Sequence, residues 1–294
     1  MQQEIFAVIG GDLRQAWLAG RLAGRGCTVR AAMLDRDVEL SPRVQKKDTV
    51  QQAVDGAGVV VLPLPVTADG VTLNAPFARG ALALADLFPL LEGRLVLGGR
   101  TAGAPQDLAR RCGAELVDYF AREELAVWNS IPTAEGALEL AMEELPTTIF
   151  GTRTLVTGYG RVAKTLCRLL VAMGAQVTVA ARKHSDFAWA RMAGAQAIHV
   201  EALADAAAGA DLVFNTVPAL LLDRGVLARL PREALVIDLA SKPGGVDFRA
   251  AGELGVKTIW ALSLPGKVAP IFSGEVIKDT ILNILEERGE THGQ

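Results

Sequence analysis

The sequence predicts an α/β protein with two domains, each built on a doubly wound parallel sheet. Short apolar runs, many of them β-branched, alternate along the chain with longer stretches rich in alanine and leucine. The runs are continuously apolar rather than alternating, which is typical of strands buried on both faces of a parallel sheet. The order strand, glycine turn, helix, strand occurs twice. Alternation of strands with helices indicates a parallel sheet, and the repetition indicates two of them with a cleft between the domains.

Length and composition agree with two folded domains and exclude several functions. The chain has 294 residues, of which 50% are hydrophobic and 21% charged, and ~150 residues is a usual domain size. A net charge of −3 leaves no basic excess for nucleic acid. Three scattered cysteines argue against disulfides and a zinc site and fit a reducing cytosol. We find no signal-peptide pattern and no apolar stretch of membrane-spanning length, so we expect a cytoplasmic protein without membrane contact.

The continuous apolar runs predict the strands in chain order. They are Ile5–Ile9, Thr28–Met33, Val59–Leu62, Leu95–Leu97, Thr154–Thr157, Gln176–Ala180, Asp211–Phe214, Leu235–Asp238 and Lys257–Trp260. Between them, stretches such as Arg161–Met173 carry apolar residues at helical spacing and predict helices.

A helix over Ala134–Leu145 is expected to link the two domains. It is entered through Ile131–Thr133, and Thr133 is a residue type favoured at helix N-caps. The last helix, about Gly274–Arg288, has one apolar face that could pack back on the first domain. We therefore expect a first domain over 1–131, completed by 274–294, and a second over 132–273.

The strongest motif follows the strand over Thr154–Thr157. The segment Gly158–Ala163 fits G-x-G-x-x-A between a strand and an apolar helix. There the first glycine permits a tight turn, the second admits a pyrophosphate, and the alanine keeps the helix close to the strand. The motif predicts a Rossmann-type dinucleotide site contacted by Gly158, Gly160, Arg161 and Val162. The alternative is a packing turn without a ligand.

The following strand ends in a basic turn that favours NADP. An enzyme that uses NAD usually places an acidic residue there to accept from the ribose 2′-hydroxyl. This chain has Arg182 and Lys183, with Ser185 nearby, and two cations with a hydroxyl suit a 2′-phosphate. The alternative is a solvated basic turn. Further along, Asn215, Thr216, Val217 and Pro218 follow a strand of the same domain and are expected at the nicotinamide half of the cofactor.

The N-terminal loop Gly10–Gln15 lacks the G-x-G-x-x-G spacing, and Asp12 would repel a pyrophosphate. We interpret it as a substrate-side loop, because ligands of open α/β sheets bind at the carboxyl ends of the strands. Arg14 would then hold a carboxylate, unless it is an ordinary exposed arginine. No histidine falls in a segment expected to line the cleft, which argues against a 2-hydroxy acid dehydrogenase.

Six segments in the same order carry a resemblance to a known family. They are Ile9–Gln15, Trp128–Gly136, Gly158–Arg161, Asn215–Pro218, Asp238–Phe248 and Leu264–Pro270. On these residues the chain resembles the A subunits of dipicolinate synthase, over almost its whole length. It departs from the pattern expected of that family at Trp128, Lys242 and Lys267, and after Pro270.

The resemblance implies an NADP-dependent oxidoreductase that aromatises a dihydrodipicolinate-level intermediate to pyridine-2,6-dicarboxylate (dipicolinate) in sporulating cells. It also implies that the partner is a flavoprotein-like B subunit, and a homo-oligomer is possible. Because the substrate is a small dianion, cations and hydrogen-bond donors are expected around it. The candidates are Arg14, Lys242 and Lys267, with Ser130, Thr133 and Ser241 as donors. If a base is used, Asp12 is the candidate, with water as its competitor.

Two other functions remain open. The chain could be an NADP-dependent reductase of another small carboxylic acid. It could also be a cofactor-binding subunit without catalysis of its own.

Overall fold

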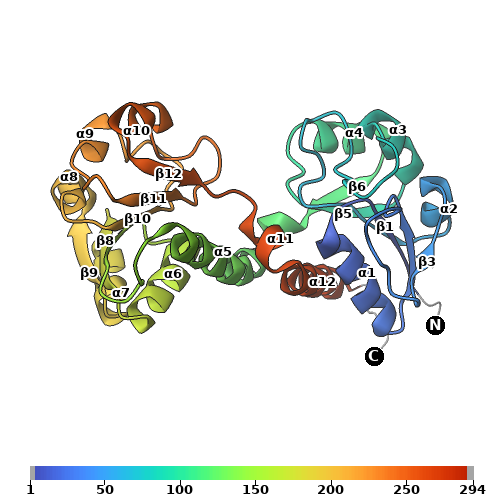
Figure 1. The fold of residues 1–294 in the computed structure, drawn as a ribbon. Helices are drawn as coiled ribbons and strands as arrows, with labels where there is room; N and C mark the ends of the chain where they lie inside the picture. Colours follow the sequence, from blue (N-terminus) through green and yellow to red (C-terminus); the bar gives the residue numbers. More distant parts are fainter. Residues whose placement is uncertain (1–3, 290–294) are drawn as a thin grey trace. The chain divides into compact units, whose positions relative to one another are not determined.

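In a computed structural model the chain divides into two units, each with one parallel sheet (Figure 1). The first unit comprises Met1–Trp128 and Ala269–Gln294, and the second comprises Asn129–Val268. The structure describes residues 4–289, so residues 290–294 of the predicted C-terminal segment lie outside it. The doubly wound parallel fold predicted from the sequence is confirmed.

The first unit has the strand order β3-β2-β1-β4-β5-β6. Its elements are β1 (Ile5–Ile9), α1 (Leu13–Gly24), β2 (Thr28–Ala32), β3 (Gln45–Lys46), α2 (Val50–Val54), β4 (Val59–Val61), α3 (Leu84–Leu87), β5 (Leu95–Gly98), α4 (Ala104–Cys112), β6 (Glu115–Asp118), the start of α5 (Glu123–Glu144), and α12 (Pro270–Glu287). Short 3₁₀ turns follow α3 and β6.

Apolar side chains of the central strands cover both faces of this sheet. In β1, Phe6 and Val8 join a core with α1 and α12, while Ala7 and Ile9 join a core with α2 and α3. Helix α12 packs along α1 at a close approach. A Cβ on Gly274 would lie 2.6 Å from the carbonyl oxygen of Arg14, so only glycine fits there. The C-terminal helix is therefore part of the first unit.

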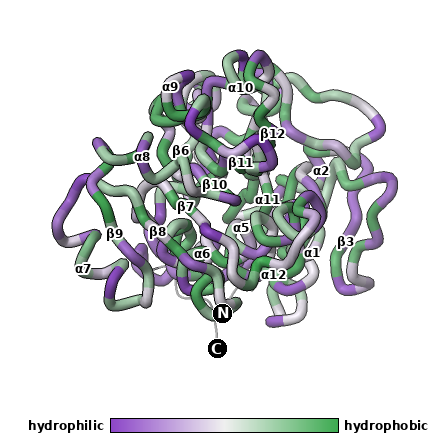
Figure 2. Tube along the Cα trace, turned by 60° about the vertical axis from the view of Figure 1, so that its left-hand side comes forward, coloured by the Kyte–Doolittle hydropathy of each residue, from purple (hydrophilic) through white to green (hydrophobic). Residues whose placement is uncertain are grey.

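The second unit repeats the arrangement with the order β12-β11-β10-β7-β8-β9. Its elements are the rest of α5, β7 (Arg153–Thr157), α6 (Arg161–Ala172), β8 (Gln176–Ala181), α7 (His184–Met192), β9 (Gln196–His199), α8 (Leu203–Ala207), β10 (Leu212–Asn215), α9 (Arg224–Leu227), β11 (Leu235–Asp238), α10 (Phe248–Leu254), β12 (Lys257–Trp260) and α11 (Leu264–Val268). The buried strands consist mainly of hydrophobic residues, whereas many connecting loops are hydrophilic (Figure 2).

Helix α5 is longer than the linker helix predicted from the sequence. The expected start at Ala134 with Thr133 as N-cap is wrong, because α5 begins at Glu123 and continues through Pro132. Proline removes one backbone donor, which bends or weakens a helix without always ending it. Thr133 lies inside the helix, and its hydroxyl donates to the carbonyl oxygen of Asn129 at 2.7 Å. Helix α12 likewise begins earlier than predicted, with Pro270 in its first turn.

Candidate functional site

The turn after β7 has a geometry that requires glycine at Gly158. Its φ is +81°, and its N–H donates to the carbonyl oxygen of Ala180 on β8 at 2.8 Å. A Cβ at this position would lie 2.7 Å from Cγ2 of Val217 and 2.8 Å from Oγ1 of Thr216. Any larger residue would therefore push away the loop that follows β10.

Gly160 differs, because no protein atom would lie within 4 Å of a Cβ built on it. It is the N-cap residue of α6, and that helix has neither a side-chain cap nor an acidic residue in its first turn. The third motif position, Ala163, is fully buried against the sheet. Open space above the second glycine and an uncapped helix N-terminus fit a pyrophosphate group.

Three polar side chains join the carboxyl ends of β7, β10 and β11. Thr157, Asn215 and Asp238 are aligned partners across these strands, and all three are fully buried. The Thr157 hydroxyl donates to Oδ1 of Asn215, and Nδ2 of Asn215 donates to Oδ1 of Asp238 at 2.7 Å. Asp238 and Thr157 are not among the predicted site residues. One sequence feature could have identified them: each of these apolar runs ends in a polar residue at the carboxyl edge of the sheet.

Asp238 also fixes the loop that follows β11. Its Oδ2 accepts from the N–H of Gly245 at 2.8 Å, and its Oδ1 accepts from the N–H of Ala240 at 3.0 Å. A Cβ on Gly245 would lie 2.4 Å from Nδ2 of Asn215. Ser241 and Lys242 are exposed in this loop. The loops after β10 and β11 are thus held to one buried carboxylate.

The loop after β10 carries the other predicted cofactor residues. Thr216 donates its hydroxyl to the carbonyl oxygen of Thr157 at 2.7 Å. The N–H of Val217 donates to Oδ1 of Asn215 at 3.2 Å, and the carbonyl oxygen of Val217 accepts from Nδ2 of the same residue at 3.0 Å. Pro218 is exposed. The structure brings Thr216 and Val217 next to Gly158, as a shared ligand site requires.

The basic turn after β8 is open to solvent. Arg182 and Lys183 are both exposed, and neither has an ion-pair partner within residues 4–289. Lys183 is the N-cap residue of α7, and Ser185 is exposed in the first turn of that helix. Both cations and this hydroxyl are therefore available to an anionic group at the end of β8.

The other predicted substrate residues of the second unit divide into two kinds. Lys242 and Lys267 are exposed, Lys267 on α11. Ser130 is 2% exposed, and its Oγ lies 2.7 Å from Oγ1 of Thr165 on α6. Since the Thr133 hydroxyl is also engaged within α5, Ser130 and Thr133 support α5 and α6 in this structure.

The glycine loop of the first unit is covered by its own chain. The N–H of Gly11 donates to the carbonyl oxygen of Asn74 at 2.9 Å. A Cβ on Gly10 would lie 3.0 Å from Leu73 and 3.1 Å from Ala75. Asp12 follows as N-cap of α1 and pairs with Arg14. Unlike the space above Gly160, this turn is filled by the segment 73–75.

Within residues 4–289 the structure gives no metal-binding arrangement, and the basic turn after β8 includes His184, between Lys183 and Ser185. His184 and His199 both lie edge-on to Phe187, and no cluster of three or more metal-ligating side chains occurs in the described part of the chain. None of the helices between residues 4 and 289 has the length and apolar character needed to cross a membrane.

Comparisons with known proteins agree with this geometry. Residues 5–120 match the family model for the N-terminal domain of the dipicolinate synthase A subunit, and residues 147–251 match one described as putative NAD(P)-binding. The dipicolinate synthase A subunit of Bacillus subtilis is 30% identical over 286 residues, covering 96% of this chain and 95% of the relative. The chain belongs to the family of dipicolinate synthase A subunits.

Solved structures of this family share the fold. The dipicolinate synthase A subunit from Bacillus halodurans has a TM-score of 0.88 at 29% identity, with 96% of this chain and 98% of that chain covered. Its counterpart from Bacillus subtilis has a TM-score of 0.87 at 28% identity, with 99% of both chains covered. The protein is thus an oxidoreductase-type subunit with an NAD(P)-binding domain in its second unit.

Proposed function

We propose that this protein is an NADP-dependent oxidoreductase that converts a dihydrodipicolinate-level intermediate into dipicolinate during sporulation. The observation that carries the proposal is the contrast between the two glycines of the loop after β7. Gly158 is enclosed by the chain, whereas Gly160 faces open space at an uncapped helix N-terminus. That combination suits a dinucleotide pyrophosphate. The name of the relatives, dipicolinate synthase, supports the choice of product.

The choice of NADP over NAD rests on the turn after β8. Arg182 and Lys183 are exposed without ion-pair partners in the described part of the chain, and Ser185 lies beside them. A 2′-phosphate could accept charge-assisted hydrogen bonds from both cations, whereas a ribose 2′-hydroxyl would gain little from them.

The reaction removes one hydride and one proton from the dihydropyridine ring. The loop at Gly158 and Gly160 and the turn after β8 would hold NADP⁺, which would supply the hydride acceptor, and the proton would pass to water. Since the product is aromatic, the step needs positioning more than strong acid–base catalysis. The chain supplies that positioning by holding the loop at Thr216 and Val217 to the buried Asn215–Asp238 pair.

The dianionic substrate needs cations, and the second unit offers exposed Lys242 and Lys267 with the hydroxyl of Ser241. Ser130 and Thr133 are weaker candidates, because their hydroxyls would have to exchange the partners they have in this structure. A buried hydroxyl that loses one hydrogen bond must gain another to avoid a penalty.

We further propose that the protein works in the cytoplasm with a flavoprotein-like second subunit. The relatives are named for one lettered subunit of dipicolinate synthase, which supports an assembly of at least two kinds of chain. A homo-oligomer of this chain is compatible with that proposal.

The test is turnover by the purified full chain. Dihydrodipicolinate is supplied with NADP⁺ or NAD⁺, and the ultraviolet absorbance of dipicolinate is followed together with reduction of the cofactor. Formation of dipicolinate with a preference for NADP⁺ supports the proposal. Cofactor binding with no turnover until the second subunit is added favours a non-catalytic role. Turnover of another small carboxylic acid alone would favour a different reductase, and no affinity for either cofactor overturns the proposal.

A further inference from the structure

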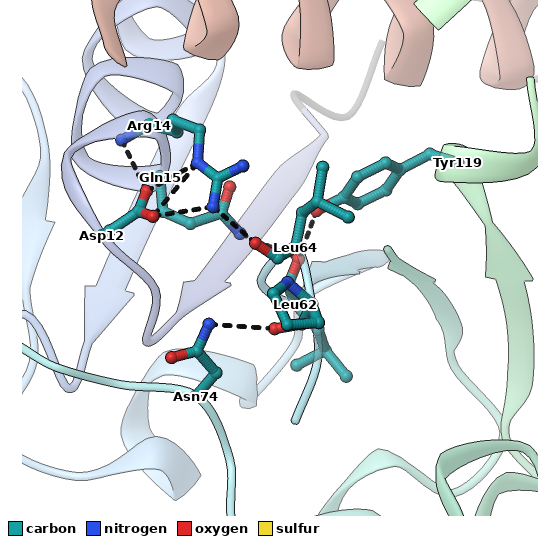
Figure 3. A network of polar contacts seen from close by, with 8 residues as sticks. Asp12, Arg14, Gln15, Leu62, Leu64, Asn74 and Tyr119 are labelled. Carbon is teal, nitrogen blue, oxygen red and sulfur yellow. Dashed lines mark hydrogen bonds and ion pairs between the residues drawn. The ribbon is translucent and has the colours of Figure 1, made fainter. Parts of the chain in front are cut away.

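The first unit has the same strand order as the second, but its glycine turn does not offer a phosphate site. The segment 73–75 lies over Gly10 and Gly11, and the acidic side chain of Asp12 begins the helix that follows. Ligands of open parallel sheets nevertheless bind at the carboxyl ends of the strands. The polar groups at this edge, shown in Figure 3, therefore need an explanation of their own.

Arg14 is held by three oxygen atoms on two elements. Its Nε donates to Oδ1 of Asp12 at 2.9 Å, and its Nη2 donates to Oδ2 of the same residue at 2.7 Å. Nη2 also donates to the carbonyl oxygen of Leu64, which follows β4 (Figure 3). A planar guanidinium held along one edge by a carboxylate keeps a fixed orientation.

The backbone that receives Arg14 is itself fixed by two further side chains. The carbonyl oxygen of Leu62 accepts from Nε2 of Gln15 at 2.8 Å and from the hydroxyl of Tyr119 at 3.0 Å. Tyr119 is fully buried, and burial raises the pKa of its phenol, so it remains a donor. Asn74 donates to the carbonyl oxygen of Pro65 at 3.2 Å. The strand end at Leu62–Pro65 is thus a stiff support for Arg14.

Two polar groups of this network remain without partners within residues 4–289. Nη1 of Arg14 donates to no protein acceptor, although only 12% of the side chain is exposed. Oε1 of Gln15 is buried and accepts from no protein donor. Nη1 is reachable from solvent and can donate to an anionic ligand, whereas the buried Oε1 can only accept and would not be satisfied by a carboxylate.

We propose that this edge of the first unit is a carboxylate-binding site, with Nη1 of Arg14 as the donor and Asp12 as the positioning residue. The ligand class is a small aromatic or dihydroaromatic dicarboxylate, one of whose carboxylates Arg14 receives; that identity rests on the proposed function. Asp12 does not act as a base. Both of its oxygens accept from the Arg14 guanidinium, and Oδ1 also accepts from the Arg14 N–H at 3.0 Å.

Binding by the full chain tests the site directly. Wild type and the variants Arg14→Ala, Asp12→Asn and the double variant are titrated calorimetrically with pyridine-2,6-dicarboxylate and with pyridine-2-carboxylate. We expect Arg14→Ala to weaken dicarboxylate binding by about 10-fold or more, as for loss of a charge-assisted hydrogen bond. It should also remove the preference for the dicarboxylate. Asp12→Asn should weaken binding less, and should have no further effect once Arg14 is absent.

Two matched control variants separate a role of Arg14 and Asp12 in ligand binding from a purely structural role. Asp223→Asn changes the acidic N-cap of α9, and Arg21→Ala removes an exposed arginine of α1 that pairs with Glu275. Neither should alter dicarboxylate binding. Asparagine is itself a good N-cap, so Asp12→Asn should keep its melting temperature.

Kinetics distinguish positioning from base catalysis. For Asp12→Asn we expect a raised KM with kcat and its pH profile unchanged. A large fall in kcat, with loss of the acidic limb of that profile, would make Asp12 a base and overturn the assignment. Equal binding by wild type and all Arg14 and Asp12 variants would overturn the site, even if dipicolinate is formed. Conversely, Arg14-dependent binding by a chain that forms no dipicolinate would support the site and count against the proposed reaction.

Discussion

Asn215 and Asp238 lie directly opposite each other at the ends of β10 and β11, and the Asn215 amide donates to the Asp238 carboxylate at 2.7 Å. Both side chains are fully buried. The amide uses both donors and both acceptor positions, toward Asp238, Thr157 and the backbone of Val217. Satisfied buried networks of this kind stiffen their surroundings. The loops proposed to meet the nicotinamide therefore begin from a rigid edge of the sheet.

Changing Asp238 to Asn should destabilise the second unit despite the similar shape. The carboxylate accepts from three N–H groups, and an amide would direct its own N–H toward at least one of them. We expect a cost of about 1–3 kcal/mol, the usual penalty for an unsatisfied buried group. Urea unfolding followed by tryptophan fluorescence measures it, since Trp260 donates to the carbonyl oxygen of Ala240 in the affected loop. Asp223→Asn is the exposed control, and equal unfolding midpoints for both variants would contradict the prediction.

The two glycines of the loop after β7 should respond differently to alanine. Gly158→Ala forces a positive φ on alanine and a contact 2.7 Å from Val217, so both stability and cofactor binding should fall. Gly160→Ala meets no protein atom within 4 Å, so the melting temperature should hold while cofactor affinity drops at least 10-fold, because the methyl group occupies the space left for the pyrophosphate. Thermal melting and fluorescence titration with NADPH test the pair. Undiminished NADPH binding by Gly160→Ala would place the cofactor elsewhere.

The central strands could be predicted because burial on both faces makes them continuously apolar. Every predicted strand is present, with ends shifted by at most one residue. Strands β3, β6 and β9 are not among the predicted strands, and all three lie at sheet edges. Edge strands are partly exposed, and β3 is the two exposed polar residues Gln45 and Lys46, so the apolar signal disappears there.

The glycine loop after β7 was predictable because the residues that define it are consecutive in the sequence. The partnership of Asn215 with Asp238 was not, because it depends on the register of two strands 23 residues apart. The same holds for Arg14, whose carbonyl partner at Leu64 lies 50 residues away. The predicted start of α5 is wrong because Pro132 suggests a boundary, whereas tertiary packing carries the helix through it.

Cys167 should resist alkylation in the folded protein. It is fully buried in α6, and burial raises the pKa of its thiol to about 12. Because the thiolate is the reactive form, iodoacetamide at pH 8 should modify the partly exposed Cys112 and leave Cys167 unmodified, as mass spectrometry would show. The raised pKa also means that this residue's contribution to stability is complete below the ordinary thiol pKa of ~8.5 and is lost as the pH rises toward 12. Labelling of Cys167 at the same rate as Cys112 would contradict its burial.

Arg182→Ala should weaken the binding of NADPH and leave the binding of NADH unchanged. The side chain is exposed at the end of β8 and has no ion-pair partner in the described residues, so its removal should leave the fold intact. Loss of one charge-assisted hydrogen bond to a 2′-phosphate costs about 1.5–3 kcal/mol, which is roughly 10- to 150-fold in Kd for NADPH, with Kd for NADH unchanged. Fluorescence titration of both reduced cofactors measures the ratio. Arg191→Ala, in the last turn of α7, is the matched control and should alter neither affinity. An equal loss for NADH and NADPH on Arg182→Ala would show that this arginine does not read the 2′-phosphate, because NADH lacks that group.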